Sequence, residues 1–265
     1  MTSLPAAAAQ EIDRLGVSLD RDGVDRLDRY LALLLEANEK VNLTAVRDRD
    51  SAWSRLIVDS LTVVPFLDEQ AGDGLSMIDV GTGGGLPGLP VAIARPAWSV
   101  TLLDATAKKA DAVRGFVEAL GLEHVRVVQG RAEAVGHEGD HRERYDVAVC
   151  RGVGVMAELL EYTLPMVRVG GAVLAMKGPK VKDELAAAGD ALAELGGGEL
   201  AVYDAYPEGF DNELVMVWVS KSERTPEAYP RLPGVPKREP IGLEPKPSRP
   251  AGKKKPTRRR RSAGG

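Results

Sequence analysis

The chain has 265 residues, of which 44% are hydrophobic, so it can bury a sizeable core and is not disordered as a whole. Its single cysteine, Cys150, excludes internal disulfides and cysteine-based zinc sites, and a total of three histidines argues against a histidine-rich metal site. The net charge of −4 conceals an asymmetry: residues 1–220 hold 21 Lys and Arg against 35 Asp and Glu, whereas residues 221–265 hold 14 against 4.

The sequence contains no membrane-spanning or secretory pattern. No apolar run reaches the roughly 18 residues that a membrane helix needs. The first 15 residues lack the basic start and the apolar stretch of a signal peptide. We therefore expect a cytoplasmic protein that contacts no membrane.

Helical spacing of apolar residues characterises the N-terminal part of the chain. A short helix is expected over 6–16, and the leucines of 22–38 recur at the spacing of a longer amphipathic helix. Residues 51–68 predict a third helix, which Pro65 breaks or kinks. Residues 1–68 are therefore assigned to a helical extension that precedes the main domain.

Strands and helices alternate between residues 69 and 221, which we assign to one α/β domain. The expected strands are 76–80, 100–104, 125–129, 145–150, 171–176, 200–206 and 213–220, and the expected helices are 88–94, 108–120, 156–166 and 181–195. Such alternation predicts a mostly parallel sheet with helices on both faces. The last two strands have no helix between them and are expected to form an antiparallel hairpin at one edge.

Two segments follow this domain. Residues 222–243 form a C-terminal segment, and residues 244–265 are Pro-rich, almost free of aliphatic side chains, and expected to be disordered. The polycation at 253–261 is of the kind that contacts phosphates. Our hypothesis is that this tail supplies salt-dependent attraction to nucleic acid, while the fold supplies specificity.

A glycine-rich loop follows the first expected strand. It begins at Asp79, contains Gly81, Gly83 and Gly85, and leads through Leu86 into a helix. Glycines allow the backbone to turn sharply and to approach a ligand closely. In an α/β sheet, this position at the carboxyl end of the first strand is where nucleoside cofactors bind.

A carboxylate completes the pattern. Asp104 ends the next strand, 21 residues after Gly83, where it can accept hydrogen bonds from both hydroxyls of a ribose. The spacing of the last three glycines also satisfies the dinucleotide fingerprint, so a nicotinamide oxidoreductase stays open as an alternative. The order D-x-G-x-G-x-G from Asp79 to Gly85 instead resembles motif I of class I S-adenosylmethionine-dependent methyltransferases, as does the terminal hairpin.

Further stretches resemble one family within that class, the small-subunit ribosomal RNA methyltransferase G family. The matching stretches are 38–46, 59–61, 78–90, 102–104, 131–133, 150–151, 176–178, 229–231 and 234–236. The chain departs from the family pattern at Leu56, where a histidine is common, at Ala37, where a tryptophan is common, and in the additional glycine of 152–154.

The resemblance implies methylation of guanine N7 at position 527 of 16S ribosomal RNA, with S-adenosyl-L-methionine as cofactor. The implied partner is 16S RNA, the 30S subunit or one of its assembly intermediates, and the protein is expected to be a monomer. Carried over residue by residue, the cofactor contacts are Gly81, Leu86, Ala132, Glu133 and Arg151, and Asp104 takes the ribose role. Asp79, Gly83 and Gly85 belong to the cofactor loop.

No catalytic side chain and no metal are expected. Guanine N7 carries a free in-plane lone pair and loses no proton when it attacks the methyl group, so alignment of the reactants is the main requirement. Cys150 is interpreted as a small buried strand residue. Candidate RNA contacts are Arg47, Arg49, Arg55, Lys177, Lys180 and Arg231.

Two alternatives stay open beside this reading. The chain could be a class I methyltransferase that acts on another RNA site, a protein or a small molecule. It could also be a non-catalytic RNA-binding or ribosome-assembly factor, which an absence of cofactor binding would support.

Overall fold

The computed structural model of the chain describes residues 4–69, 74–208, 210 and 212–244. The polycation at 253–261, and all of the predicted disordered tail except Glu244, lie outside the described residues. Within the described part, no helix is both long enough and apolar enough to cross a membrane.

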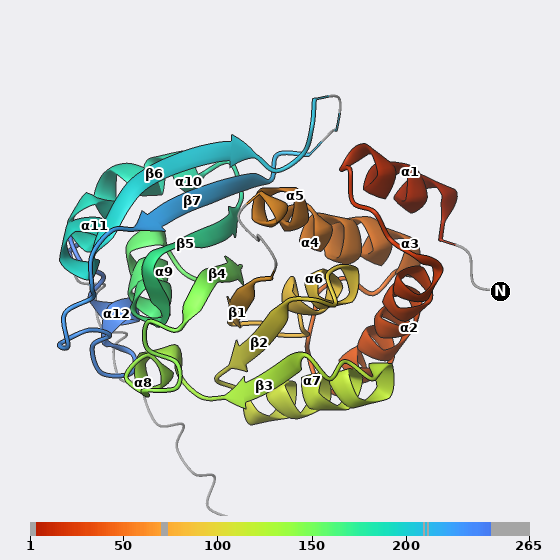
Figure 1. Cartoon of the computed structure of the whole chain (residues 1–265), viewed down its shortest axis with the longest axis horizontal. Helices are drawn as coiled ribbons and strands as arrows, with labels where there is room; N and C mark the ends of the chain where they lie inside the picture. The colour runs from red at the N-terminus through yellow and green to blue at the C-terminus, as the bar shows by residue number, and fades with distance from the viewer. Residues whose placement is uncertain (1–3, 70–73, 209, 211, 245–265) are drawn as a thin grey trace, which may run out of the picture.

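A seven-stranded sheet forms the centre of the molecule, with the strand order β3-β2-β1-β4-β5-β7-β6 (Figure 1). The strands are β1 (Ser76–Val80), β2 (Ser99–Asp104), β3 (Val125–Gln129), β4 (Tyr145–Arg151), β5 (Val167–Lys177), β6 (Gly197–Asp204) and β7 (Val215–Lys221). The first five are parallel, whereas β7 pairs antiparallel with both β5 and β6. The predicted mostly parallel sheet with an antiparallel edge hairpin is confirmed, and so is the class I methyltransferase fold.

Side chains alternate along the strands between two hydrophobic cores. Met77 of β1 and Val149 of β4 belong to one core, and their neighbours Ile78 and Cys150 belong to the other. Each face of the sheet therefore needs its own cover of helices. Cys150 is fully buried, as expected of a small strand residue, and burial raises the pKa of its thiol.

The N-terminal helices cover one face together with the helices that follow β1 and β2 (Figure 1). They are α1 (Ala6–Arg14), α2 (Arg21–Asn38), α3 (Arg49–Ala52), the π-helix η1 (Trp53–Val58), α4 (Asp59–Leu61), α5 (Val63–Asp68), α6 (Gly88–Ala94) and α7 (Ala107–Leu120). The helix expected over 51–68 is thus divided. The division after α4 precedes Pro65, which lies in the first turn of α5, where a missing N–H costs no hydrogen bond.

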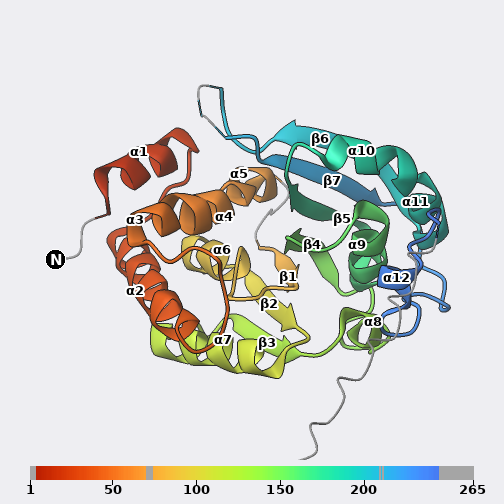
Figure 2. The same ribbon diagram turned by 180° about the vertical axis from the view of Figure 1, so that it is seen from behind.

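The other face is covered by later helices, which Figure 2 shows from behind. They are α8 (Ala132–Val135), α9 (Met156–Thr163), the 3₁₀ turn η2 (Leu164–Met166), α10 (Val181–Leu185), the 3₁₀ turn η3 (Ala186–Ala188), α11 (Gly189–Leu195) and α12 (Val235–Arg238). The prediction of a single helix over 181–195 is therefore wrong. It is divided where Gly189, a poor helix former, follows the 3₁₀ turn.

The fifth strand is longer than expected. It begins at Val167 rather than at residue 171, because a bulge shifts the pairing between Tyr145 and Val147. Gly170, at a φ of +82°, supplies the left-handed backbone conformation that keeps the strand continuous through this irregularity.

Candidate cofactor and acceptor site

The glycine loop between β1 and α6 closes around a buried carboxylate. Asp79 Oδ2 accepts hydrogen bonds from Thr82 Oγ1 (2.7 Å) and from the Gly88 amide (2.8 Å), which ties both ends of the loop to the end of β1. A Cβ atom on Gly88 would lie 2.9 Å from that same oxygen and 2.2 Å from Leu102 Cδ2. Only glycine lets α6 approach the sheet this closely.

The Asp79 carboxylate is electrostatically unusual. Burial raises its pKa to about 6, even though the bonds from Thr82 and Gly88 and the charge of Arg151 act in the opposite direction. Its second oxygen, Oδ1, is buried and has no hydrogen-bond partner among the described residues. A buried acceptor of this kind carries a free-energy cost that a well-placed donor would relieve.

Asp104 holds the loop from the neighbouring strand. Its Oδ2 accepts from the Gly83 amide (2.9 Å), and its Oδ1 accepts from the Thr106 amide (2.7 Å) at the start of α7. The carboxylate is 7% exposed. Asp104, for which a ribose role was predicted, therefore fixes the backbone of the glycine loop.

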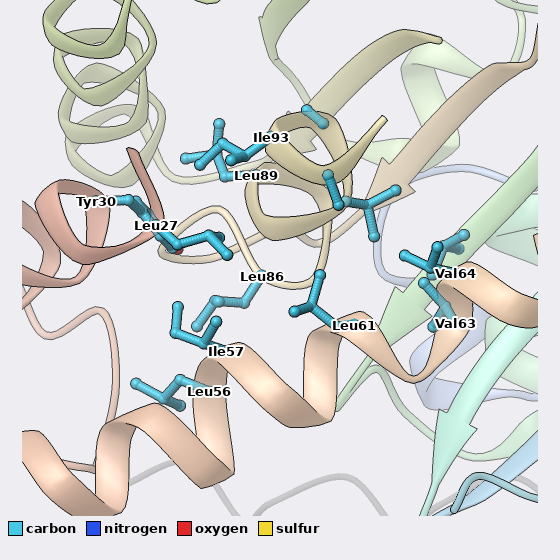
Figure 3. Close-up of a cluster of buried hydrophobic side chains, with 14 of the residues drawn as sticks. Leu27, Tyr30, Leu56, Ile57, Leu61, Val63, Val64, Leu86, Leu89 and Ile93 are labelled. Atoms are coloured by element: carbon cyan, nitrogen blue, oxygen red, sulfur yellow. The ribbon is translucent and has the colours of Figure 1, made fainter. Parts of the chain in front are cut away.

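The N-terminal helices support the loop from the opposite side. The hydroxyl of Tyr30 in α2 is buried and donates to the Gly84 carbonyl (2.9 Å). Leu86 is 5% exposed, and its side chain lies in the apolar cluster with Ile57 and Leu61 (Figure 3). Leu56 belongs to the same cluster, so the departure from the family pattern at this position fits its apolar surroundings.

A cavity opens where the carboxyl ends of β1, β2 and β3 meet. Gly81 forms part of its wall with a φ of +79°, and a Cβ there would approach Val153 Cγ2 to 3.0 Å. The missing side chain thus keeps this part of the cavity open. The lining residues are Val80, Gly81, Leu103, Ala105, Gly130, Arg131, Ala132, Glu133, Val153, Glu158, Tyr162 and Lys237.

Glu133 lies in this wall with its carboxylate fully engaged. Arg131 contacts it through two hydrogen bonds, from Nη2 to Oε1 (2.6 Å) and from Nε to Oε2 (3.1 Å). The Gly234 amide also donates to Oε1 (2.8 Å). Burial acts to raise the pKa of Glu133, but these donors outweigh it and lower the pKa, so the group is anionic at neutral pH.

A groove adjoins the cavity at the ends of β4 and β5. Arg151, Lys177 and Lys180 line it, and Val153 is common to both depressions. Lys177 forms an ion pair with Glu184 (2.9 Å) and donates to the Gly154 carbonyl (2.8 Å). The groove therefore has a positive lining immediately beside the cavity.

The predicted site residues thus fall into three places. Gly81, Ala132 and Glu133 line the cavity, and Arg151 lines the adjacent groove. The remaining predicted residues belong to the loop and its supports and are not among the residues that line the cavity: Asp79, Gly83, Gly85, Leu86 and Asp104.

Sequence reasoning missed four polar or aromatic cavity residues: Arg131, Glu158, Tyr162 and Lys237. Among the candidate RNA contacts, Arg231 forms a bidentate ion pair with the buried Glu161, and Arg49 forms an ion pair with Asp28. Arg231 is thus engaged in a buried ion pair and Arg49 in an exposed one, which a count of charges along the sequence could not reveal.

Comparison with known proteins identifies the family of this chain. The family model of rRNA small subunit methyltransferase G matches residues 24–207. The chain belongs to this family. The ribosomal RNA small subunit methyltransferase G of Leuconostoc citreum is 39% identical over 85% of this chain and 94% of its own length. That of Pelotomaculum thermopropionicum is 37% identical over 91% of this chain and 100% of its own length.

Family membership confirms the prediction of an S-adenosylmethionine-dependent RNA methyltransferase. Among solved structures, an rRNA methylase from Streptococcus thermophilus is 19% identical, with a TM-score of 0.45 over 60% of this chain and 93% of that one. A precorrin-6y C5,15-methyltransferase from Geobacter metallireducens is 18% identical, with a TM-score of 0.44 over 63% and 88%. The fold assignment does not depend on these likenesses, because it rests on the strand order of the sheet.

Proposed function

We propose that this chain transfers a methyl group from S-adenosylmethionine to N7 of guanine 527 in 16S ribosomal RNA. The observation that supports this most directly is the juxtaposition of the cavity and the positive groove across Val153. The relatives are named as methyltransferases of small-subunit ribosomal RNA, which gives the substrate class.

The cavity offers S-adenosylmethionine a lining that is both apolar, at Val80 and Leu103, and charged, at Glu133 and Lys237. When bound, this cofactor supplies the electrophilic methyl group. Gly81 leaves space for a ligand where any side chain would intrude, and the loop around Asp79 and Asp104 is held rigidly from three sides. Ala132 and Glu133 follow the third strand and border the side of the cavity where we assign the adenine.

The groove suits an RNA acceptor. Arg151 and Lys180 offer cationic groups for the phosphates that flank a looped-out nucleotide, and sequence-specific RNA recognition usually takes such unstacked bases. A base in this groove would lie beside Val153, next to the cavity. The protein's part in the reaction is thus to hold the acceptor N7 in line with the methyl group and to exclude other geometries.

No proton needs to be removed from guanine N7, because its lone pair lies in the plane of the base and the methylated product is a cation. The one thiol beside the site belongs to Cys150, and burial raises its pKa, so it stays protonated and unreactive at neutral pH. Asp79 has no access to an acceptor base, because its carboxylate is fully buried beneath the loop.

The test is methyl transfer from labelled S-adenosylmethionine to 30S subunits and to 16S RNA from a strain that lacks this gene. A matched substrate carries another base in place of guanine 527. We expect label in the unaltered RNA, none in the altered RNA, and N7-methylguanine on digestion.

Three other results would contradict the proposal at different points. Label that persists in the altered RNA would leave a methyltransferase with another RNA target. Cofactor binding without RNA label would direct the search to protein or small-molecule acceptors. Absence of cofactor binding would favour a non-catalytic assembly factor.

A further inference from the structure

The C-terminal segment, residues 222–243, lies outside the part of the chain that the family model matches. It nevertheless packs against the cofactor cavity. Arg142 donates to the Tyr229 carbonyl (2.8 Å) and the Thr225 carbonyl (2.7 Å), and His137 Nε2 lies 2.7 Å from the Pro230 carbonyl oxygen. These contacts fasten the segment to the turn after α8.

A buried ion pair fixes the same segment to α9. Arg231 makes a bidentate contact with Glu161, whose side chain is fully buried, and it also donates to the Glu239 carbonyl (2.8 Å). The chain then enters α12 through Gly234, at a φ of +86°. This turn directs the Gly234 amide to the Glu133 carboxylate and brings Lys237 to the cavity.

Lys237 differs from the other cations of the segment. Arg224, Arg231 and Arg238 each form an ion pair, with Glu143, Glu161 and Glu239 respectively. No ion pair or hydrogen bond of the Lys237 ammonium is found within the described part of the chain, although its side chain lines a cavity that also contains Glu133. An unpaired cation in a cavity wall is a donor available to a ligand.

We infer that the C-terminal segment is part of the cofactor site, with Lys237 as a direct contact to the nucleoside half of S-adenosylmethionine and Gly234 as a positioning residue for Glu133. The inference rests on the proposed use of this cavity for the cofactor. The nucleoside half is assigned because α12 borders the cavity beside Glu133, at the end of β3, away from the glycine loop after β1. Ring nitrogens and ribose oxygens are the acceptors that an ammonium can reach there.

The experiment compares ligand binding by the full chain and its Lys237→Ala variant, using S-adenosylmethionine and a methylthio-nucleoside that lacks the amino-acid part. We expect both ligands to bind roughly five- to tenfold more weakly, the range for losing one charge-assisted hydrogen bond at an exposed position. The KM for the cofactor should rise while kcat and the KM for RNA stay unchanged. Lys237→Arg should recover most of the affinity.

Arg238→Ala is the matched control, since Arg238 is the adjacent cation of α12, is exposed like Lys237, and does not line the cavity. It should bind both ligands as the unaltered chain does. Gly234→Ala tests the positioning role. Its Cβ meets no atom within 4 Å, so the strain at positive φ is what displaces the amide from Glu133. The loss of cofactor affinity should be larger than the fall in unfolding temperature can explain.

The outcomes separate the inference from the proposed function. Normal binding by Lys237→Ala would overturn the contact and leave the proposed function intact. A loss for S-adenosylmethionine alone, with the nucleoside unaffected, would move Lys237 to the methionine end and also overturn the inference. Failure of the unaltered chain to bind either ligand would overturn the proposed function itself.

Discussion

The two sides of the cavity are stabilised in different ways. On the glycine-loop side, the Asp79 and Asp104 carboxylates accept hydrogen bonds from the loop itself. Close backbone approach and apolar packing around the buried Tyr30 and Leu86 leave no room there for added volume. On the C-terminal side, ion pairs and charged hydrogen bonds connect α8, α9 and the C-terminal segment. Their partners lie far apart in the chain: Arg231 pairs with Glu161, and the Gly234 amide donates to Glu133.

This difference bears on how each side responds to change. A tightly packed backbone tolerates no added volume, whereas a buried ion pair tolerates no loss of one partner. The loop side should therefore be sensitive to substitutions that enlarge a residue, and the C-terminal side to substitutions that remove a charge.

The largest expected effect is on the C-terminal side. Arg231→Ala leaves the fully buried Glu161 carboxylate without its cation, which should cost about 3–5 kcal/mol in unfolding free energy. Denaturant unfolding measures this. Arg238→Ala, which breaks only an exposed pair with Glu239, should change stability by less than about 1 kcal/mol. Equal losses in the two variants would remove the distinction between the buried pair and the surface pair.

On the loop side, the one strong electrostatic effect comes from Asp79. Burial raises its pKa to about 6, whereas an unfolded aspartate titrates near pH 4. Between those values the folded state holds a proton that the unfolded state has lost, so the unfolding free energy falls as the pH rises from about 4 to above 6. The stability lost over that window is about 3 kcal/mol.

Asp79→Asn cannot titrate, and other carboxylates contribute equally to both proteins. The stability of the unaltered chain relative to this variant should therefore decrease between pH 4 and pH 7, as measured by denaturant unfolding at each pH. A difference that stays constant with pH would mean that Asp79 is not desolvated as the fold indicates.

Added volume is the next test of the loop. Gly88→Ala would place a Cβ 2.2 Å from Leu102 Cδ2, so α6 or the sheet must move. This should lower the unfolding free energy by about 1–3 kcal/mol and weaken cofactor binding. Gly115→Ala is the control, because its Cβ meets nothing within 4 Å inside α7. That variant should gain up to about 1 kcal/mol from helix propensity. Destabilisation by both substitutions would contradict the close-approach argument.

The same contrast explains what could be predicted from the sequence. The strand ending at Val80 and the helix beginning at Gly88 were placed correctly, since an apolar run followed by clustered glycines is a local signal. Asp104 was predicted from its spacing as a ribose-binding carboxylate, a role that stays a prediction, whereas its bond to the Gly83 amide was not predicted. The elements on the glycine-loop side could therefore be predicted from local pattern and spacing.

The C-terminal side of the cavity has no such signal. The helix α12 has only four residues and no periodicity, and α8 is equally short. Gly234 lies 101 residues from Glu133, and nothing in a single sequence connects the two. Lys237 could have been found only by knowing how the C-terminal segment packs, which is a property of the tertiary structure.

The smallest expected effect concerns the contact between the N-terminal helices and the loop. Tyr30→Phe keeps the buried ring but removes the donor to the Gly84 carbonyl, leaving a buried acceptor unpaired at a cost of about 1–2 kcal/mol. Tyr203→Phe, at a ring that is 47% exposed, is the matched control and should be neutral.

If α2 positions the loop and does more than cover the sheet, Tyr30→Phe should also weaken cofactor binding at temperatures where the variant is fully folded. Titration with S-adenosylmethionine well below the unfolding transition measures this. The KM for RNA should stay unchanged, because Tyr30 contacts the loop and not the groove. A loss of stability with normal cofactor affinity would instead mean that the loop keeps its shape through Asp79 and Asp104 alone, and that the N-terminal helices serve only the core.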